Sequence, residues 1–181
     1  MDNGGQWTHR EWRVLKYLKV DTKIIPNTTP ADDIDADGLV LSGGTPRIGS
    51  DELKLGSTGE LLDSLDIPIL GICAGFQMMI LHHGGNVGPA EVPEYGQVEV
   101  VVDDEDHILK GVEKRFIAWE SHNDEVKSLP EGFVKLAHSE NTPFQAVRHT
   151  SRPLFGLQFH PEVEHTQHGE TMFRNFVELC K

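Results

Sequence analysis

The chain has few cysteines, few basic residues and no long apolar run, and each shortage excludes a class of protein. Its 181 residues include two cysteines, Cys73 and Cys180, which do not make the disulfide framework of a secreted domain. The longest apolar stretch covers a few residues around Pro68, whereas a membrane-spanning helix needs about 20. No basic and apolar signal segment opens the sequence. We therefore expect a cytoplasmic protein that does not bind a membrane.

The charge balance argues against nucleic acid as a partner. Lys and Arg number 16 against 29 Asp and Glu, which gives a formal net charge of −13. Such a chain repels phosphate backbones. The apolar fraction of 38%, together with 18 glycines, is typical of a globular domain. We expect one domain over residues 1–181.

Apolar runs alternate with amphipathic stretches in the first half of the chain. Strands are predicted at residues 23–26, 38–41 and 67–72, and helices at residues 7–19, 57–65 and 77–81. This alternation indicates an α/β fold with a parallel sheet covered by helices. A turn-like segment opens the chain where such folds have a strand. That strand is therefore absent from this chain, or the sheet is one strand short.

The second half is predicted to contain short strands followed by one helix. The strands are expected at residues 97–102, 116–119, 133–137, 144–147 and 154–159. From Glu170 onward, apolar residues form a stripe at helical spacing.

The sharpest motif is Gly-Ile-Cys-Ala-Gly at residues 71–75, between a predicted strand and a predicted helix. It has the G-x-nucleophile-x-G pattern of α/β-type hydrolases, with Cys73 in place of serine. Glycines on either side allow the sharp bend that lifts the side chain out of the sheet. The helix N-terminus favours the thiolate, and the Ala74 amide can donate to an oxyanion. A buried structural cysteine is the alternative.

A second motif, Phe-His-Pro-Glu at residues 159–162, follows a predicted strand. His160 and Glu162 are two residues apart and lean to the same side of an extended chain. The carboxylate can orient one imidazole nitrogen while the other faces the thiol, as in a Ser-His-Asp triad. A surface histidine in a proline turn is the alternative.

Two further segments carry weaker signals. Residues 42–46, Ser-Gly-Gly-Thr-Pro, place a glycine pair after a strand, where free amides can hold an oxyanion. They partly resemble the pyrophosphate loop of ATP pyrophosphatases but lack its Asp-Ser, so an oxyanion donor is the preferred interpretation and a plain turn the alternative. Residues 119–126 are densely polar and form either a solvated turn or the lining of a pocket for a zwitterion.

The sequence gives little support for a metal site. Four potential ligands, His160, Glu162, His165 and His168, lie within nine positions, but neither an H-E-x-x-H motif nor a C-x-x-C pair is present. We expect no metal and place His165 and His168 at the start of the last helix.

Together the motifs resemble the class I, or triad, glutamine amidotransferases. Residues 71–77 match that family's G-x-C-x-G-x-Q element, residues 159–162 its F/W-H-P-E element and residues 42–44 its oxyanion loop. The sequence departs from the family at Thr45, where proline is usual. The resemblance implies a flavodoxin-like α/β fold, with a central, mostly parallel sheet flanked by helices and a small antiparallel extension.

Four other segments are similar to the stand-alone glutamine amidotransferase subunits of archaeal GMP synthetases: residues 2–6, 25–30, 119–126 and 160–166. This resemblance implies that L-glutamine is the substrate and that ammonia passes to a separate ATP-pyrophosphatase subunit. ATP and magnesium would then bind to that partner, and this chain would hold no cofactor. The alternatives are a subunit of an anthranilate or carbamoyl-phosphate type synthase, or a non-catalytic glutamine-sensing subunit.

The resemblance also assigns roles to individual residues. Cys73 would be the nucleophile, His160 the general base and acid, and Glu162 the group that orients His160. The amides of Gly44 and Ala74 would form the oxyanion hole. The residues implied in glutamine binding are Gly43, Gln77, Ser121 and His122.

Overall fold

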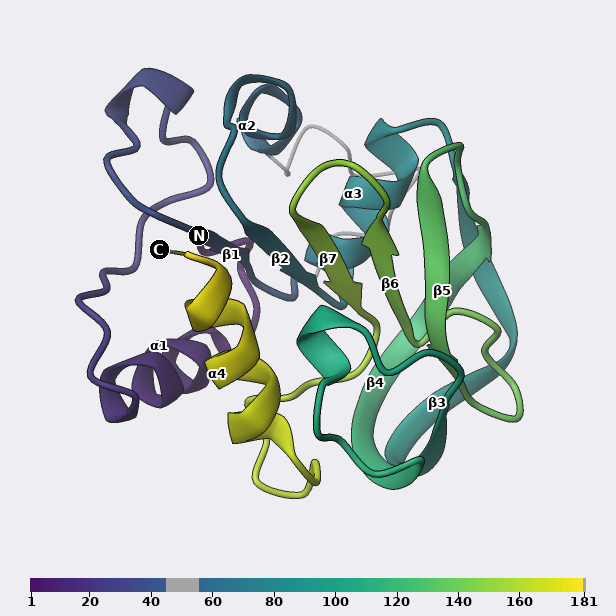
Figure 1. Cartoon of the computed structure of the whole chain (residues 1–181). Helices are drawn as coiled ribbons and strands as arrows, with labels where there is room; N and C mark the ends of the chain where they lie inside the picture. Colours follow the sequence, from purple (N-terminus) through teal and green to yellow (C-terminus); the bar gives the residue numbers. More distant parts are fainter. Residues whose placement is uncertain (45–55, 181) are drawn as a thin grey trace.

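A curled sheet of seven strands, in the order β1-β2-β7-β6-β5-β3-β4, runs through the structure (Figure 1). This computed structural model describes residues 1–44 and 56–180. The strands are β1 Leu39–Leu41, β2 Ile69–Ile72, β3 Asn86–Val102, β4 Arg115–Ser128, β5 Phe133–His138, β6 Ala146–His149 and β7 Leu154–Leu157. The helices are α1 Thr8–Tyr17, α2 Thr58–Ser64, α3 Ala74–His82 and α4 Gly169–Leu179, with short 3₁₀ turns η1 Ala31–Asp33 and η3 His107–Leu109.

The sheet is parallel at one end and antiparallel at the other. β1 pairs with β2 and β2 with β7 in parallel, and the remaining pairings are antiparallel. This confirms an α/β fold with a mixed sheet, but the antiparallel part is larger than a small extension. The reason is the long β3–β4 hairpin, which extends from Asn86 opposite Ser128 to Val101 opposite Arg115, with an irregularity between Pro89 and Glu94. Only the end next to the connecting loop has an unbroken strand-like pattern, since the far half also contains glycine, proline and charged residues, so the sequence predicted only that end.

Side chains of the parallel strands alternate between two buried layers. Val40, Leu70 and Phe155 belong to a layer that includes residues of α1 and α4. Leu39, Ile69 and Leu154 belong to a second layer with residues of α2 and α3. In Figure 1, α4 and α3 accordingly lie on opposite sides of the sheet. Burial on both faces explains why these strands are continuous apolar runs in the sequence.

Residues 1–4 run beside the end of β1 without forming a regular strand. The Met1 nitrogen donates to Val40 O at 2.6 Å, and Ser42 N donates to Met1 O at 3.1 Å. An isolated bridge joins Asp2 to Pro26. The strand predicted at residues 23–26 is therefore wrong, because this bridge is its one strand-like pairing and Pro26 has no N–H to extend a ladder.

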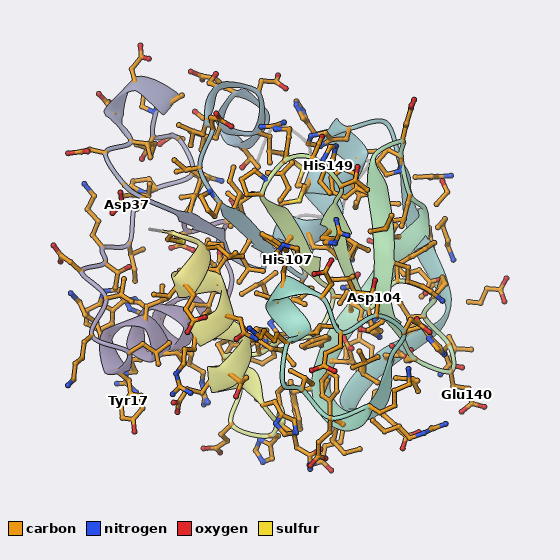
Figure 2. The ribbon with its side chains drawn as sticks, in the orientation of Figure 1. Tyr17, Asp37, Asp104, His107, Glu140 and His149 are labelled. Carbon is orange, nitrogen blue, oxygen red and sulfur yellow. The ribbon has the colours of Figure 1, made fainter. Side chains whose placement is uncertain are left out.

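The outer surface carries exposed polar and aromatic side chains. Tyr17, the last residue of α1, is 74% exposed and points away from the sheet (Figure 2). Among the described helices, none is both long and apolar enough to cross a membrane.

Candidate active site

Cys73 lies at the bend between β2 and α3, in a strained backbone conformation. Its φ of 50° and ψ of −109° fall in a region that residues other than glycine rarely adopt. The bend leaves no room for side chains at the flanking glycines. A Cβ on Gly71 would lie 2.7 Å from Phe76 N, and one on Gly75 would lie 2.3 Å from Leu41 O. The predicted turn therefore forms at residues 71–75, and its two glycines are sterically required.

Helix α3 begins directly after the nucleophile. Gln77 N donates to Cys73 O at 2.9 Å and makes the first bond of the helix. The preceding amides, beginning with that of Ala74, have no acceptor within the helix. The positive end of the helix dipole therefore lies next to Cys73.

His160 and Glu162 form a buried pair. His160 Nδ1 lies 2.7 Å from Glu162 Oε1, and the two residues are 4% and 6% exposed. Burial by itself disfavours an imidazolium ion. Two neighbours outweigh that effect. The Cys73 sulfur contributes its charge and a hydrogen bond with the imidazole ring, and the adjacent Glu162 carboxylate acts in the same direction. The pKa of His160 is therefore raised well above its usual range. The pair is therefore arranged to accept a proton from the thiol.

Gly43 shows how closely the thiol and the imidazole approach. A Cβ on Gly43 would lie 3.2 Å from His160 Cε1 and 3.7 Å from Cys73 Cβ. These three residues and Glu162 line a cavity of about 340 Å³. The cavity falls within the size range of small-molecule sites. The fold thus brings Cys73 together with His160 and Glu162, which lie almost ninety positions later in the sequence.

The N-terminal segment forms another wall of this cavity. Its lining residues are Gly4, Gly5, Gln6, Trp7, Thr8 and Glu11. Gly5 packs so tightly that an added Cβ would lie 2.4 Å from Gly43 O. The sequence did not predict that these residues line the cavity. Only the similarity of residues 2–6 to the archaeal GMP synthetase subunits pointed to this segment.

Glu11 is a buried acid in the same wall. It is 4% exposed although it belongs to an amphipathic helix, where a charged residue normally faces water. Burial and the nearby Glu162 charge raise the pKa of Glu11 to about 8. A neutral carboxyl group therefore borders the cavity at pH 7.

The residues predicted to bind glutamine fall into two groups. Gly43 and Ser121 line the cavity, and Gly44, predicted to hold the oxyanion, lines it as well. Gln77 and His122 are buried and are not among its lining residues. Their assigned roles, like that of the Ala74 amide, stay predictions. Thr45 and Pro46 of the predicted glycine loop lie outside the described residues.

Ser121 and His122, both predicted to bind glutamine, are neighbours in β4, but only one of them lines the cavity. The densely polar segment at residues 119–126 is part of this strand, so its interpretation as a solvated turn is wrong. Ser121 and His122 point to opposite faces because strand side chains alternate. Ser121 consequently reaches the cavity, and His122 points into the protein.

A comparison of the sequence with protein-family models identifies the family of this chain. Residues 1–180 match the model described as "Glutamine amidotransferase class-I". The chain belongs to the class I glutamine amidotransferases.

Known proteins are similar to this amidotransferase over almost its whole length. A glutamine-hydrolysing GMP synthase subunit from Thermoplasma volcanium is 50% identical over 182 residues, which span 100% of this chain and 90% of that protein. One from Thermococcus kodakarensis is 50% identical over 186 residues, spanning 99% and 96% of the two chains. A crystal structure of a Thermoplasma acidophilum protein, described as a GMP synthase subunit, matches with a TM-score of 0.95 at 50% identity, covering 99% of this chain and 91% of that chain.

The amidotransferase has one cluster in its described part that resembles a metal site, formed by Glu94, Glu120 and His122. His122 Nε2 lies 3.4 Å from Oε2 of each glutamate. Glu94 already accepts hydrogen bonds from Ser139 and Gln145 on its two oxygens. Burial and the charge of Glu94 raise the pKa of Glu120 well above its usual range, which favours its neutral form. Glu94 is therefore already engaged by two donors, and Glu120 is favoured in its neutral form.

Proposed function

We propose that this chain is the glutamine-hydrolysing subunit of a GMP synthase. The observation that carries the proposal is the convergence of Cys73, His160 and Glu162 at one cavity. The similarity of the whole chain to proteins named as glutamine-hydrolysing GMP synthase subunits supports the same function. It favours this acceptor over the anthranilate and carbamoyl-phosphate alternatives.

The proposed reaction proceeds through a thioester on Cys73. The thiolate attacks the side-chain amide carbon of glutamine, and the amides of Gly44 and Ala74 donate to the oxyanion that forms. Each such donor contributes roughly 3 kcal/mol in comparable sites. His160 protonates the departing ammonia, which leaves a glutamyl thioester. Water then gives a proton to His160 and attacks the thioester, which releases glutamate and regenerates the thiolate.

Glu162 acts on this reaction through His160. Its carboxylate holds the proton of Nδ1, which leaves Nε2 to exchange a proton with the sulfur or the leaving group. It also stabilises the imidazolium that exists while the tetrahedral intermediate persists.

Gly43 and Ser121 contact the amino-acid end of the glutamine from the cavity wall. Gln77 and His122 support this wall from behind. Gln77 Nε2 donates to Asp124 O at 2.7 Å, and His122 Nδ1 lies 3.0 Å from the same oxygen. They therefore fix the backbone of β4 near Ser121.

The ammonia passes to a separate ATP-pyrophosphatase subunit, which adenylates and aminates xanthosine monophosphate (XMP). ATP, magnesium and XMP bind to that subunit, and this chain carries no cofactor or metal. The similar proteins are themselves named as subunits of a GMP synthase, which supports the existence of a second polypeptide. The pair acts in purine biosynthesis in the cytoplasm.

A glutaminase assay with and without the partner tests the proposal. Glutamate release is expected to be slow for the isolated chain and to rise when the pyrophosphatase subunit, XMP, ATP and magnesium are added. GMP should form at the same rate as glutamate in the complete mixture. A rate that is unchanged by the partner and its substrates contradicts the assignment to GMP synthase. Stimulation by a chorismate-using partner instead would favour an anthranilate synthase subunit.

A further inference from the structure

Gln158 lies directly beside the nucleophile. β2 and β7 are parallel neighbours, and Cys73 N donates to Leu157 O at 2.7 Å, so Gln158 follows β7 at the level of the bend. The Gln158 side chain is completely buried, and its Nε2 lies 3.7 Å from Cys73 Sγ. An amide N–H at this distance can donate to sulfur, and a thiolate is a better acceptor than a thiol.

A second buried amide determines which end of Gln158 faces the sulfur. Gln77 reaches Asp124 O at 2.7 Å, and because a carbonyl oxygen only accepts, the Gln77 atom there is the nitrogen. The same nitrogen lies 3.1 Å from Gln158 Oε1. Gln158 therefore accepts from Gln77 with its oxygen and must present its nitrogen to Cys73. The hydrogen bonds from Asp124 O through Gln77 to Gln158 therefore place a donor, Gln158 Nε2, at the Cys73 sulfur.

We propose that Gln158 is a further catalytic residue whose side-chain amide donates to the Cys73 sulfur and stabilises its thiolate, and that Gln77 is a positioning residue acting through Gln158. This inference rests on the proposed function for its effect on turnover. The donor acts twice in the proposed reaction. It holds the thiolate before the attack on glutamine, and it stabilises the same thiolate when the thioester breaks. Together with His160, it gives the sulfur two hydrogen-bonding partners.

The reactivity of the thiol tests this role without relying on glutamine hydrolysis. The rate of alkylation by iodoacetamide is measured across pH in a Cys180→Ser background, which leaves Cys73 as the sole cysteine. Gln158→Met keeps the length of the side chain and removes the donor. We expect the midpoint of the alkylation profile to move to higher pH by about one unit. Gln158→Glu replaces the donor by an acceptor and should shift it further, and Gln77→Met should produce a smaller shift in the same direction.

A neighbouring glutamine provides a matched control. Gln145 is equally buried, and its backbone oxygen accepts from Gln158 N, but its side chain contacts Glu94 and Ser139. Gln145→Met should leave the alkylation midpoint unchanged. In glutaminase assays, Gln158→Met should lower kcat about tenfold with little change in KM, since the donor acts on the sulfur rather than on the substrate.

The outcomes separate this inference from the proposed function. If Gln158→Met or, should that variant not fold, Gln158→Glu keeps the parental midpoint, the inference is overturned even when the parent hydrolyses glutamine. An equal shift in Gln145→Met also overturns it, because the effect would then be general loosening of the core. If the parent never hydrolyses glutamine but the midpoint moves as expected, the thiolate role stands and the glutaminase function fails.

Discussion

Trp7 packs edge-to-face against His160, with ring centroids 4.4 Å apart and an interplanar angle of 72°. The two residues are far apart in the sequence, and both line the cavity. His160 is thus held from two sides, by the Glu162 carboxylate at Nδ1 and by the indole against its ring. The N-terminal segment therefore belongs to the catalytic site as a support for its histidine.

Replacing Trp7 tests this support. Trp7→Ala should lower kcat for glutamine hydrolysis about tenfold, because the imidazole loses a contact that limits its orientation. Trp7→Phe keeps an aromatic edge and should retain most of the activity. Steady-state kinetics measure both effects. Trp12 lies within α1, which begins directly after Trp7; it donates to Thr22 O and is not among the cavity-lining residues. An equal loss in Trp12→Ala would show that helix stability is responsible.

Cys73→Ser should abolish glutamate release while preserving the fold. The hydroxyl is slightly smaller than the thiol and far harder to ionise, so it remains unreactive in this position. Thermal unfolding and circular dichroism should match the parent within small differences. Glutamate release close to the parental rate would show that another group is the nucleophile.

Glu162→Gln should reduce kcat by about 10²- to 10⁴-fold, as expected when the carboxylate of a triad is replaced by its amide. The amide cannot stabilise the imidazolium, and its N–H group can reverse the ring tautomer. The measurement is the pH profile of kcat. The profile should also change shape, because the carboxylate helps to raise the pKa of His160. A variant with the parental pH profile would remove Glu162 from the mechanism.

Gly75→Ala should destabilise the protein strongly, and Gly88→Ala should not. The added Cβ at Gly75 would lie 2.3 Å from Leu41 O, so the backbone of β1 or α3 must move. We expect the free energy of unfolding to fall by about 1–3 kcal/mol. At Gly88 no atom lies within 4 Å of the added Cβ, and the change should stay within about 0.5 kcal/mol. Equal effects in urea unfolding would contradict the steric explanation.

Glu11→Gln should stabilise the protein increasingly as the pH rises. The pKa of Glu11 is about 8 in the folded chain against an ordinary value of 4.5. Its protonated form therefore supports the fold fully below about pH 4.5, and this contribution is lost as the pH rises to about 8. Glutamine does not ionise, so the variant should gain stability over the parent across that window.

Urea unfolding at pH 5, 7 and 8.5 measures this difference for Glu11→Gln. The matched control is Glu60→Gln on the exposed side of α2, which should change stability by less than about 0.5 kcal/mol at each pH. A stability difference that is the same at all three values would show that Glu11 is not held in its neutral form.

The sequence determined the local geometry of the nucleophile. The Gly-x-Cys-x-Gly pattern at residues 71–75 predicted the bend, and the contact of Gly71 with Phe76 N is local to it. The close approach of Gly75 to Leu41 O comes from the packing of α3 against β1. His160 and Glu162 were likewise recognisable because their spacing places them on one side of an extended segment. The helices and parallel strands followed from apolar patterns that are read within a single element.

The tertiary structure alone decided which other groups surround the sulfur. Trp7, Glu11 and Gln158 acquire their positions because residues 1–4 run beside β1 and because β2 pairs with β7. No spacing within the sequence encodes that pairing, since burial and hydrogen bonding between distant segments depend on the order of the strands. The polarity of the chain from Asp124 through Gln77 to Gln158 exists only once those segments are packed together.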